Sequence, residues 1–207
     1  MQKLAHQILL ISILFVFTAC GTYQPKNVVL TTTKSKNYIN PYFSDITQDY
    51  VYKTSIEVFG NKLGGVFVIK KIDNQKHRVV LTTNFGNKLI DFEVSPTAFT
   101  VNFIIEALEN KRLLKILETD FRLLLYPSYL VDKTFTGENQ VVYAGKQNKG
   151  TVFLHINKTK NFLYKLSFTK KSKEKITFEF EEEKDTFVGK LIISHHNLPI
   201  LIKMIKI

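Results

Sequence analysis

Residues 110–127 read NKRLLKILETDFRLLLYP, and this stretch decides the fold because no other segment shows so strong a helical pattern. Its large apolar residues recur at helical spacing, and its charged residues occupy the opposite side. Asn110 is suited to cap the helix, and Pro127 ends the run. We therefore predict one amphipathic helix from 110 to 126.

Strand patterns flank this helix on both sides. Period-two alternation begins at Tyr50 and continues to Ile105, interrupted by turn signals such as Gly60-Asn61, and it resumes from Val141 to Ile205. Short connections favour antiparallel neighbours, so the sequence predicts a mainly β fold of roughly ten strands around the helix. The apolar inner face of such a sheet must be covered, and one helix covers only part of it.

The first 26 residues read MQKLAHQILLISILFVFTACGTYQPK. Lys3, the apolar run 8–17 and the small pair Thr18-Ala19 are typical of an export signal, and the run is too short to span a bilayer. A short membrane anchor or a buried strand is the alternative. We predict a signal peptide over 1–19, a flexible tether over 20–45 that is broken by prolines, and a single domain over 46–207.

The stretch 17–20, Phe-Thr-Ala-Cys, resembles the bacterial lipobox, in which Leu usually holds the first position. The resemblance implies cleavage before Cys20 and attachment of acyl chains to this residue, which is the only cysteine of the 207-residue chain. A free thiol or an intermolecular disulfide is the alternative. Gly21 stands where some bacteria place the Asp that retains lipoproteins in the inner membrane. We therefore predict a lipid anchor in the outer membrane, with the protein on its periplasmic face.

The composition is basic, with 29 Lys and Arg against 18 Asp and Glu. Most lysines are scattered singly along strand patterns, and clusters occur in the turns HINKTKN (155–161) and FTKKSKEK (168–175). This excess is consistent with a solvated basic surface or with attraction to anionic lipid headgroups. An exported lipoprotein has little access to nucleic acid, so we predict no nucleic-acid partner.

Two stretches resemble the LolA/LolB superfamily of bacterial lipoprotein carriers and receptors. These are VVLTTNFGNKLIDFEV (79–94) and FRLLLYP (121–127), and the order of elements agrees from about 45 to 205. The family's proline before the first turn is absent, and Tyr126 replaces a glycine of its lid segment. The resemblance implies an unclosed antiparallel β-barrel with a helical lid and an apolar hollow for acyl chains. Phe85 falls where the family carries a protruding leucine used at the membrane, so we predict that Phe85 inserts into a membrane or partner; the alternative is that it folds back onto the core.

The apolar residues on the inner strand positions and on the helix predict an acyl-chain cavity. Each one taken alone is equally consistent with a packed core. The predicted cavity residues are Ile56, Val58, Phe92, Phe99, Val101, Phe103, Leu113, Leu117, Phe121, Phe162, Leu166 and Phe178.

Catalytic signatures are missing from the sequence. It contains no GxSxG elbow, phosphate-binding loop or HExxH motif, and the adjacent pair His195-His196 would point to opposite faces of a strand. We therefore predict no enzyme activity, no catalytic residues, no metal site and no cofactor. The predicted function is that of a monomeric, membrane-anchored lipoprotein that binds acyl chains or lipoproteins and helps to localise them, with a periplasmic carrier protein as a partner. The alternative is a structural or assembly lipoprotein that docks a protein partner through a sheet edge or a basic face.

Overall fold

The computed structural model describes residues 23–207 except 183 and 185. The predicted signal peptide over 1–19 and the predicted lipid site at Cys20 lie outside the described residues. Every helix and strand discussed below lies within 23–207.

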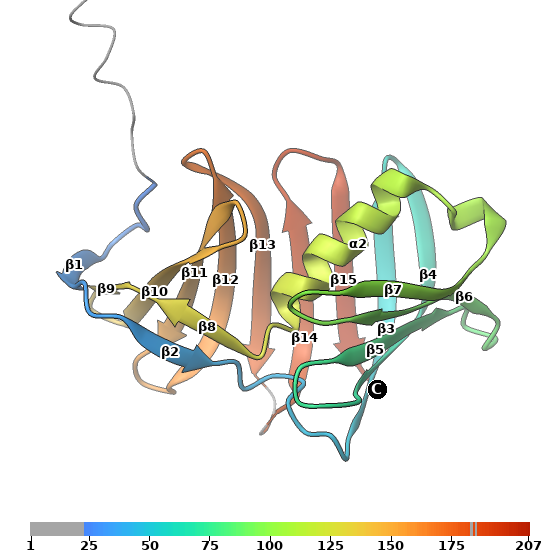
Figure 1. The fold of residues 1–207 in the computed structure, drawn as a ribbon, viewed down its shortest axis with the longest axis horizontal. Coiled ribbons are helices and arrows are strands. Elements are labelled where there is room, and N and C mark those ends of the chain that lie inside the picture. The colour runs from blue at the N-terminus through green and yellow to red at the C-terminus, as the bar shows by residue number, and fades with distance from the viewer. Residues whose placement is uncertain (1–22, 183, 185) are drawn as a thin grey trace, which may run out of the picture.

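One curved antiparallel sheet forms most of the molecule (Figure 1). Its strands lie in the order β1-β9-β10-β11-β12-β13-β14-β15-β3-β4-β5-β6-β7, so that β1 and β7 are free edges and the sheet is not closed. The prediction of a mainly β, unclosed antiparallel barrel with one principal helix is confirmed. The bounds are β1 Val29–Thr32, β3 Asp49–Val58, β4 Asn61–Lys71, β5 His77–Thr82, β6 Lys88–Val94, β7 Phe99–Ile104, β9 Lys133–Thr136, β10 Gln140–Gln147, β11 Gly150–Asn157, β12 Phe162–Lys170, β13 Lys173–Glu182, β14 Val188–His195 and β15 Ile200–Lys206.

A two-stranded ribbon of β2 (Lys36–Ile39) and β8 (Ser128–Val131) lies against the large sheet near β10. These strands, together with β1 and β9, raise the count above the roughly ten strands that we predict. Each has only four residues, which is too short for alternation to stand out in the sequence.

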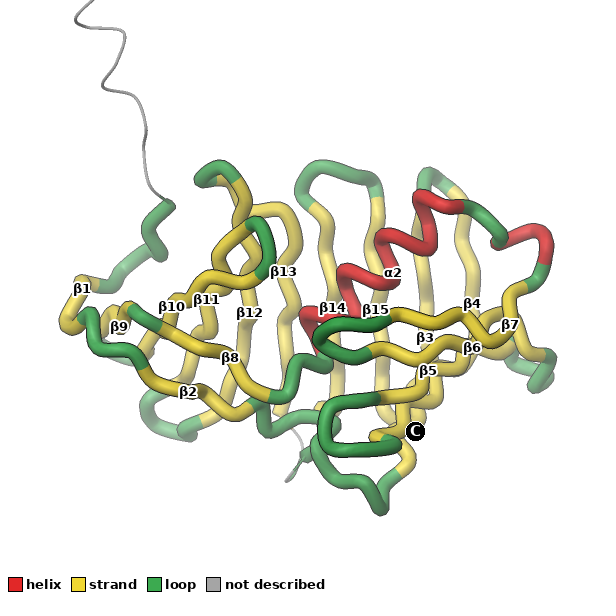
Figure 2. Tube along the Cα trace, viewed as in Figure 1, coloured by secondary structure: helices red, strands yellow, loops and turns green. Residues whose placement is uncertain are grey.

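The predicted helix is present as α2 (Lys111–Leu124), preceded by the 3-10 turn η2 (Glu106–Leu108). The Asn110 side chain caps it by accepting hydrogen bonds from the backbone N–H groups of Arg112 and Leu113 at 2.8 and 3.3 Å. Figure 2 shows α2 as one long helix lying across the inner side of the sheet. The Phe121 ring lies 5.3 Å from that of Phe67 and 5.2 Å from that of Phe92, so α2 packs on β4 and β6.

The prediction of a flexible tether over 20–45 is wrong for the part of it that contains β1 and β2. Tyr42 and Phe43, which follow these strands, are buried in the main core. The Tyr42 hydroxyl donates to the Leu163 carbonyl at 2.7 Å, and the Phe43 carbonyl lies 2.8 Å from His77 Nε2. Two aromatic side chains therefore hold this segment inside the domain, although the flanking polar residues and prolines are typical of a linker.

A buried carboxylate fixes the free edge that carries β7. Asp91 on β6 accepts from Arg78 at 2.9 Å (Nε) and 2.6 Å (Nη2), and from Lys88 Nζ at 3.0 Å. The Arg78 guanidinium holds the pKa of the Asp91 carboxyl well below its ordinary value. This cluster ties β5 to β6, and the Asn102 side-chain amide on β7 also donates to Asp91 Oδ1 at 3.3 Å.

Candidate functional site

An open groove lies where the start of α2 meets the turn between β3 and β4. Its volume is about 950 Å³, within the usual range for small-molecule sites. Its walls are mainly apolar, with polar side chains along them, and we call it the apolar groove. It is lined by Val58, Phe59, Asn61, Lys62, Leu63, Ala107, Leu108, Asn110, Lys111, Arg112 and Leu113.

The β3–β4 turn shapes one wall of the apolar groove. Phe59 and Gly60 form its two-residue loop, with φ of 48° and 84°. Both angles are left-handed, which suits a tight hairpin but is unusual for phenylalanine. The Phe59 N–H donates to the Pro199 carbonyl at 3.0 Å, which anchors the turn to the neighbouring loop and leaves the Phe59 ring half exposed.

Only two of the predicted cavity residues, Val58 and Leu113, line this groove. Two others, Phe99 and Val101, are half-buried against the main core, and Phe162 is half-buried near Tyr164. The remaining inward-facing ones are buried and packed within one continuous cluster: Ile56, Phe92, Leu117, Phe121, Leu166 and Phe178. The inner face is thus filled there by side chains of α2, β8 and the Tyr42-Phe43 pair, and the predicted hollow is reduced to a groove at its mouth.

Phe103 lies on the other face of the sheet, contrary to the prediction that it lines the cavity. A register shift between Asp91 and Phe92 pairs Phe103 with Asp91 instead of continuing the alternation of Phe99 and Val101. Phe103 is therefore 42% exposed, and its ring lies 5.7 Å from Lys88 Nζ. A β-bulge of this kind leaves no signal in an apolar alternation.

Phe85 is 95% exposed at the turn between β5 and β6, so it does not fold back onto the core. The Thr83 hydroxyl accepts from the backbone N–H groups of Phe85 and Asn87 at 3.3 and 3.2 Å, and Gly86 supplies a φ of 85°. These contacts fix the backbone of the turn and leave the Phe85 ring exposed to solvent.

A buried hydrogen bond joins α2 to the sheet. Asp120 on α2 lies 2.9 Å from His195 Nε2 on β14, and both side chains are almost completely buried. Burial raises the pKa of Asp120 above its ordinary value, and its second oxygen, Oδ1, has no hydrogen-bond partner among the residues that the structure describes. The sequence analysis missed this contact, although an Asp between Leu117 and Phe121 on the apolar side of a helix is a usable signal.

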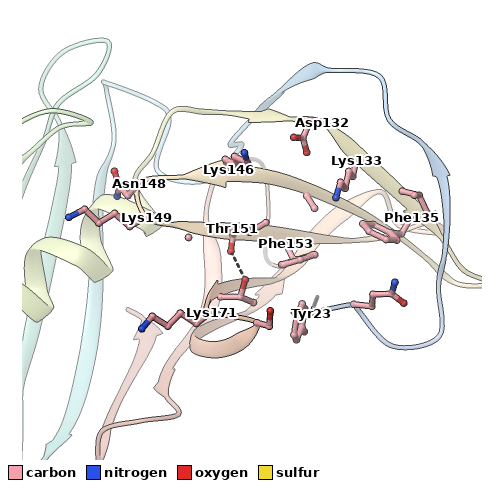
Figure 3. A pocket seen from close by; sticks show the side chains of 16 residues that line it. Tyr23, Asp132, Lys133, Phe135, Lys146, Asn148, Lys149, Thr151, Phe153 and Lys171 are labelled. Carbon is pink, nitrogen blue, oxygen red and sulfur yellow. Dashed lines mark hydrogen bonds between the residues drawn. The ribbon is translucent and has the colours of Figure 1, made fainter. Parts of the chain in front are cut away.

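A second groove of about 530 Å³ lies at the opposite end of the sheet (Figure 3). Its wall contains Tyr23, whose ring packs edge-on against Phe153 at 4.8 Å and whose hydroxyl donates to Glu174 Oε1 at 2.6 Å. Phe135 also lines it. Tyr23 and Val28 thus cover a small cluster that is separate from the main core.

The described residues form neither a metal-binding cluster nor a membrane-spanning helix. Within residues 23–207, apart from the two omitted positions, no three or more His, Cys, Asp or Glu residues gather where they could hold a metal ion. Among the same residues, α2 and the other helical segment are too short or too polar to cross a membrane.

No protein-family model matches the sequence, and no curated protein matches it. Among solved structures, the chain is similar to a LolA superfamily protein from Nitrosomonas europaea, with 8% identity, a TM-score of 0.48, and coverage of 81% of this chain and 88% of that one. It is similar to an outer membrane lipoprotein-sorting protein domain from Vibrio parahaemolyticus, with 9% identity, a TM-score of 0.45, and coverage of 79% and 85%.

A DUF1329 family protein from Desulfovibrio piger is a third similar structure, with 11% identity, a TM-score of 0.42, and coverage of 77% and 84%. Identities and scores this low transfer no function to the chain. The candidate site is therefore defined by the structure itself. An open antiparallel sheet carries α2 packed across its inner face, and the apolar groove lies where the start of α2 meets the β3–β4 turn.

Proposed function

We propose that this chain is a non-enzymatic lipid-binding lipoprotein that holds an acyl chain, free or carried by a lipoprotein, in the apolar groove. The observation that carries the proposal is the groove of about 950 Å³ between α2 and the β3–β4 turn, whose walls include Val58, Leu63, Leu108 and Leu113. The resemblance of 79–94 and 121–127 to the LolA/LolB superfamily points to the same class of ligand.

Burial of hydrocarbon supplies the binding energy in this proposal. Each methylene group that leaves water contributes about 0.8 kcal/mol. The inner face behind the groove is filled by Leu117, Phe121 and their neighbours, so a long chain enters further only if α2 moves away from the sheet. We propose that α2 acts as a lid and that the groove is its entry point.

The N-terminal stretch and the exposed Phe85 support a further proposal about attachment and partners. We propose that acyl chains on Cys20 anchor the protein at the periplasmic face of the outer membrane. The exposed Phe85 ring would enter the same membrane or a partner when a ligand is handed over. A periplasmic carrier protein is the proposed donor of that ligand.

Uptake of a fluorescent fatty acid by residues 21–207, which contain every described element, tests this function. We expect saturable binding that weakens about tenfold or more in Leu63→Asp and Leu113→Asp, because a charge would face hydrocarbon in the groove. Leu130→Asp is the matched control, since Leu130 is exposed on β8 away from the groove. Equal uptake by all three folded variants, or no saturable uptake by the parent chain, would refute the proposal.

A second candidate function rests on the free edge of the sheet. β1 is an edge strand, and its Val29 and Leu30 side chains are exposed. An apolar edge can pair with a strand of another protein, as a structural or assembly lipoprotein would require. Native mass spectrometry of gently extracted protein separates the candidates, because it reveals a lipid adduct in the first case and a stoichiometric protein subunit in the second.

A further inference from the structure

A third groove runs along α2, beside the turn between β12 and β13. Its volume is about 670 Å³. Two cationic side chains come from α2 and four come from the end of β12, the turn and the start of β13. We call it the basic groove, and its cationic residues are Arg112, Lys115, Lys170, Lys171, Lys173 and Lys175.

The charge of the basic groove is almost uncompensated. Lys115 is the only one of the six with an acidic partner within 4 Å among the described residues; it pairs with Glu118 at 2.8 Å. Glu174 lies between the groove lysines in sequence, but its carboxylate bonds to Tyr23 at 2.6 Å and lies 3.5 Å from Lys165. Within the described part of the chain, no acidic residue lines the groove. Such a concentration of one sign of charge attracts anions.

The walls between these cations are apolar. Phe168 and Ile176 are buried, and Ile116 and Leu198 are half-buried. The α2 wall repeats at helical spacing, with Arg112, Lys115, Ile116 and Thr119 on one stripe. The groove therefore presents hydrocarbon flanked by positive charge, which suits an amphiphile better than a small free anion.

Arg112 connects the two grooves, because it lines both the apolar groove and the basic groove. Resting on the function proposed above, we infer that the ligand is an anionic amphiphile. Its acyl chain lies in the apolar groove, and its phosphate or carboxylate group lies in the basic groove. Arg112, which lines both grooves, would contact the ligand where its two parts meet. Guanidinium groups bind such oxygen pairs in a bidentate manner.

Two lysophospholipids with the same acyl chain test this inference, one with an anionic phosphoglycerol headgroup and one with a zwitterionic phosphocholine headgroup. Binding to residues 21–207 is measured below the micelle-forming concentration. We expect the anionic lipid to bind about tenfold more tightly at low salt, and the preference to shrink at high salt because the lysines are exposed. Glycerol phosphate, which has the charge but no chain, should compete only weakly.

Variants assign the preference to the groove. Lys170→Glu with Lys173→Glu should abolish the preference while leaving phosphocholine lipid binding unchanged. Lys34→Glu with Lys160→Glu makes the same charge change at exposed sites outside the groove and should retain it. Equal affinity of the parent chain for both lipids would overturn the inference and leave the proposed function standing, whereas binding of neither lipid would overturn both. Glycerol phosphate that binds as tightly as the anionic lipid would contradict joint occupation of the two grooves.

Discussion

Phe85 places a large apolar ring in water, where it gains nothing for the fold of the isolated chain. We therefore expect Phe85→Asp to change the free energy of unfolding by less than about 0.5 kcal/mol. The same substitution should reduce co-sedimentation of residues 21–207 with phospholipid vesicles. Ile46→Asp, at another exposed apolar side chain, is the control and should sediment like the parent chain. Unchanged sedimentation of Phe85→Asp would contradict the proposed insertion of Phe85 into the membrane.

His155 makes stability depend on pH. Burial, reinforced by the charge of Lys165, lowers the pKa of His155 to about 4, below the ordinary value of 6.5. The unfolded chain therefore takes up a proton at a higher pH than the folded chain does. This contribution is complete above pH 6.5 and is lost as the pH falls to about 4, at a cost of about 3 kcal/mol.

His155→Phe fills the buried position without titrating, so the loss of stability between pH 7 and pH 4 should be smaller by about 3 kcal/mol than in the parent chain. Urea unfolding at the two pH values measures it. His77, whose pKa burial also lowers, remains in the variant and leaves a residual dependence of the same sign. Identical pH dependence of stability in parent and variant would show that His155 has the same pKa in the folded and the unfolded chain.

The positions of some single residues could be predicted from the sequence, and those of others could not. Alternation correctly placed Phe92 and Phe178 on the inner face, because period two is a property of the strand backbone. Phe103 was misplaced because a bulge depends on pairing with a neighbouring strand. The exposure of Phe85 stayed open in the sequence analysis because the path of a turn side chain depends on local hydrogen bonds such as those to Thr83.

At the scale of elements, the helix α2 was predictable from the sequence, but the bond between Asp120 and His195 that joins it to the sheet was not. Caps and apolar spacing lie within the segment itself, whereas the partner of Asp120 lies 75 residues further along the chain. The four-residue strands β1, β2, β8 and β9 were missed for a related reason. Pairing with distant strands stabilises them, so their own residues show no recognisable strand pattern.

The bond between Asp120 and His195 should control how easily α2 leaves the sheet. We expect His195→Ala to destabilise the chain by about 2 kcal/mol, because it leaves a buried carboxyl unsatisfied. Amide hydrogen exchange should then accelerate over Lys111–Leu124 more than over β3 or β4. His196→Ala alters the adjacent residue, whose side chain is 43% exposed, and should leave α2 protected. If both variants exchange alike in α2, the bond is not a latch.

At the scale of the whole molecule, an open sheet carries a helix bonded across its inner face, and the apolar and basic grooves lie beside that helix. The mainly β, antiparallel class of the fold followed from the number and spacing of the strand patterns, whereas the unclosed barrel was implied by the resemblance to the LolA/LolB superfamily. The extent of the cavity did not, because it depends on how completely α2, β8 and the Tyr42-Phe43 pair fill the inner face. In the proposed function, lipid binding thus depends on what the apolar groove admits and on whether α2 moves away from the sheet.

Photo-crosslinking with a diazirine-bearing fatty acid tests the central claim most directly. Residues 21–207 are irradiated with the probe, and the modified peptides are located by mass spectrometry. The account predicts saturable labelling that unlabelled fatty acid displaces, concentrated on 58–63 and 107–113, the two segments that line the apolar groove. Labelling confined to other surfaces, or labelling that excess fatty acid does not reduce, would contradict it.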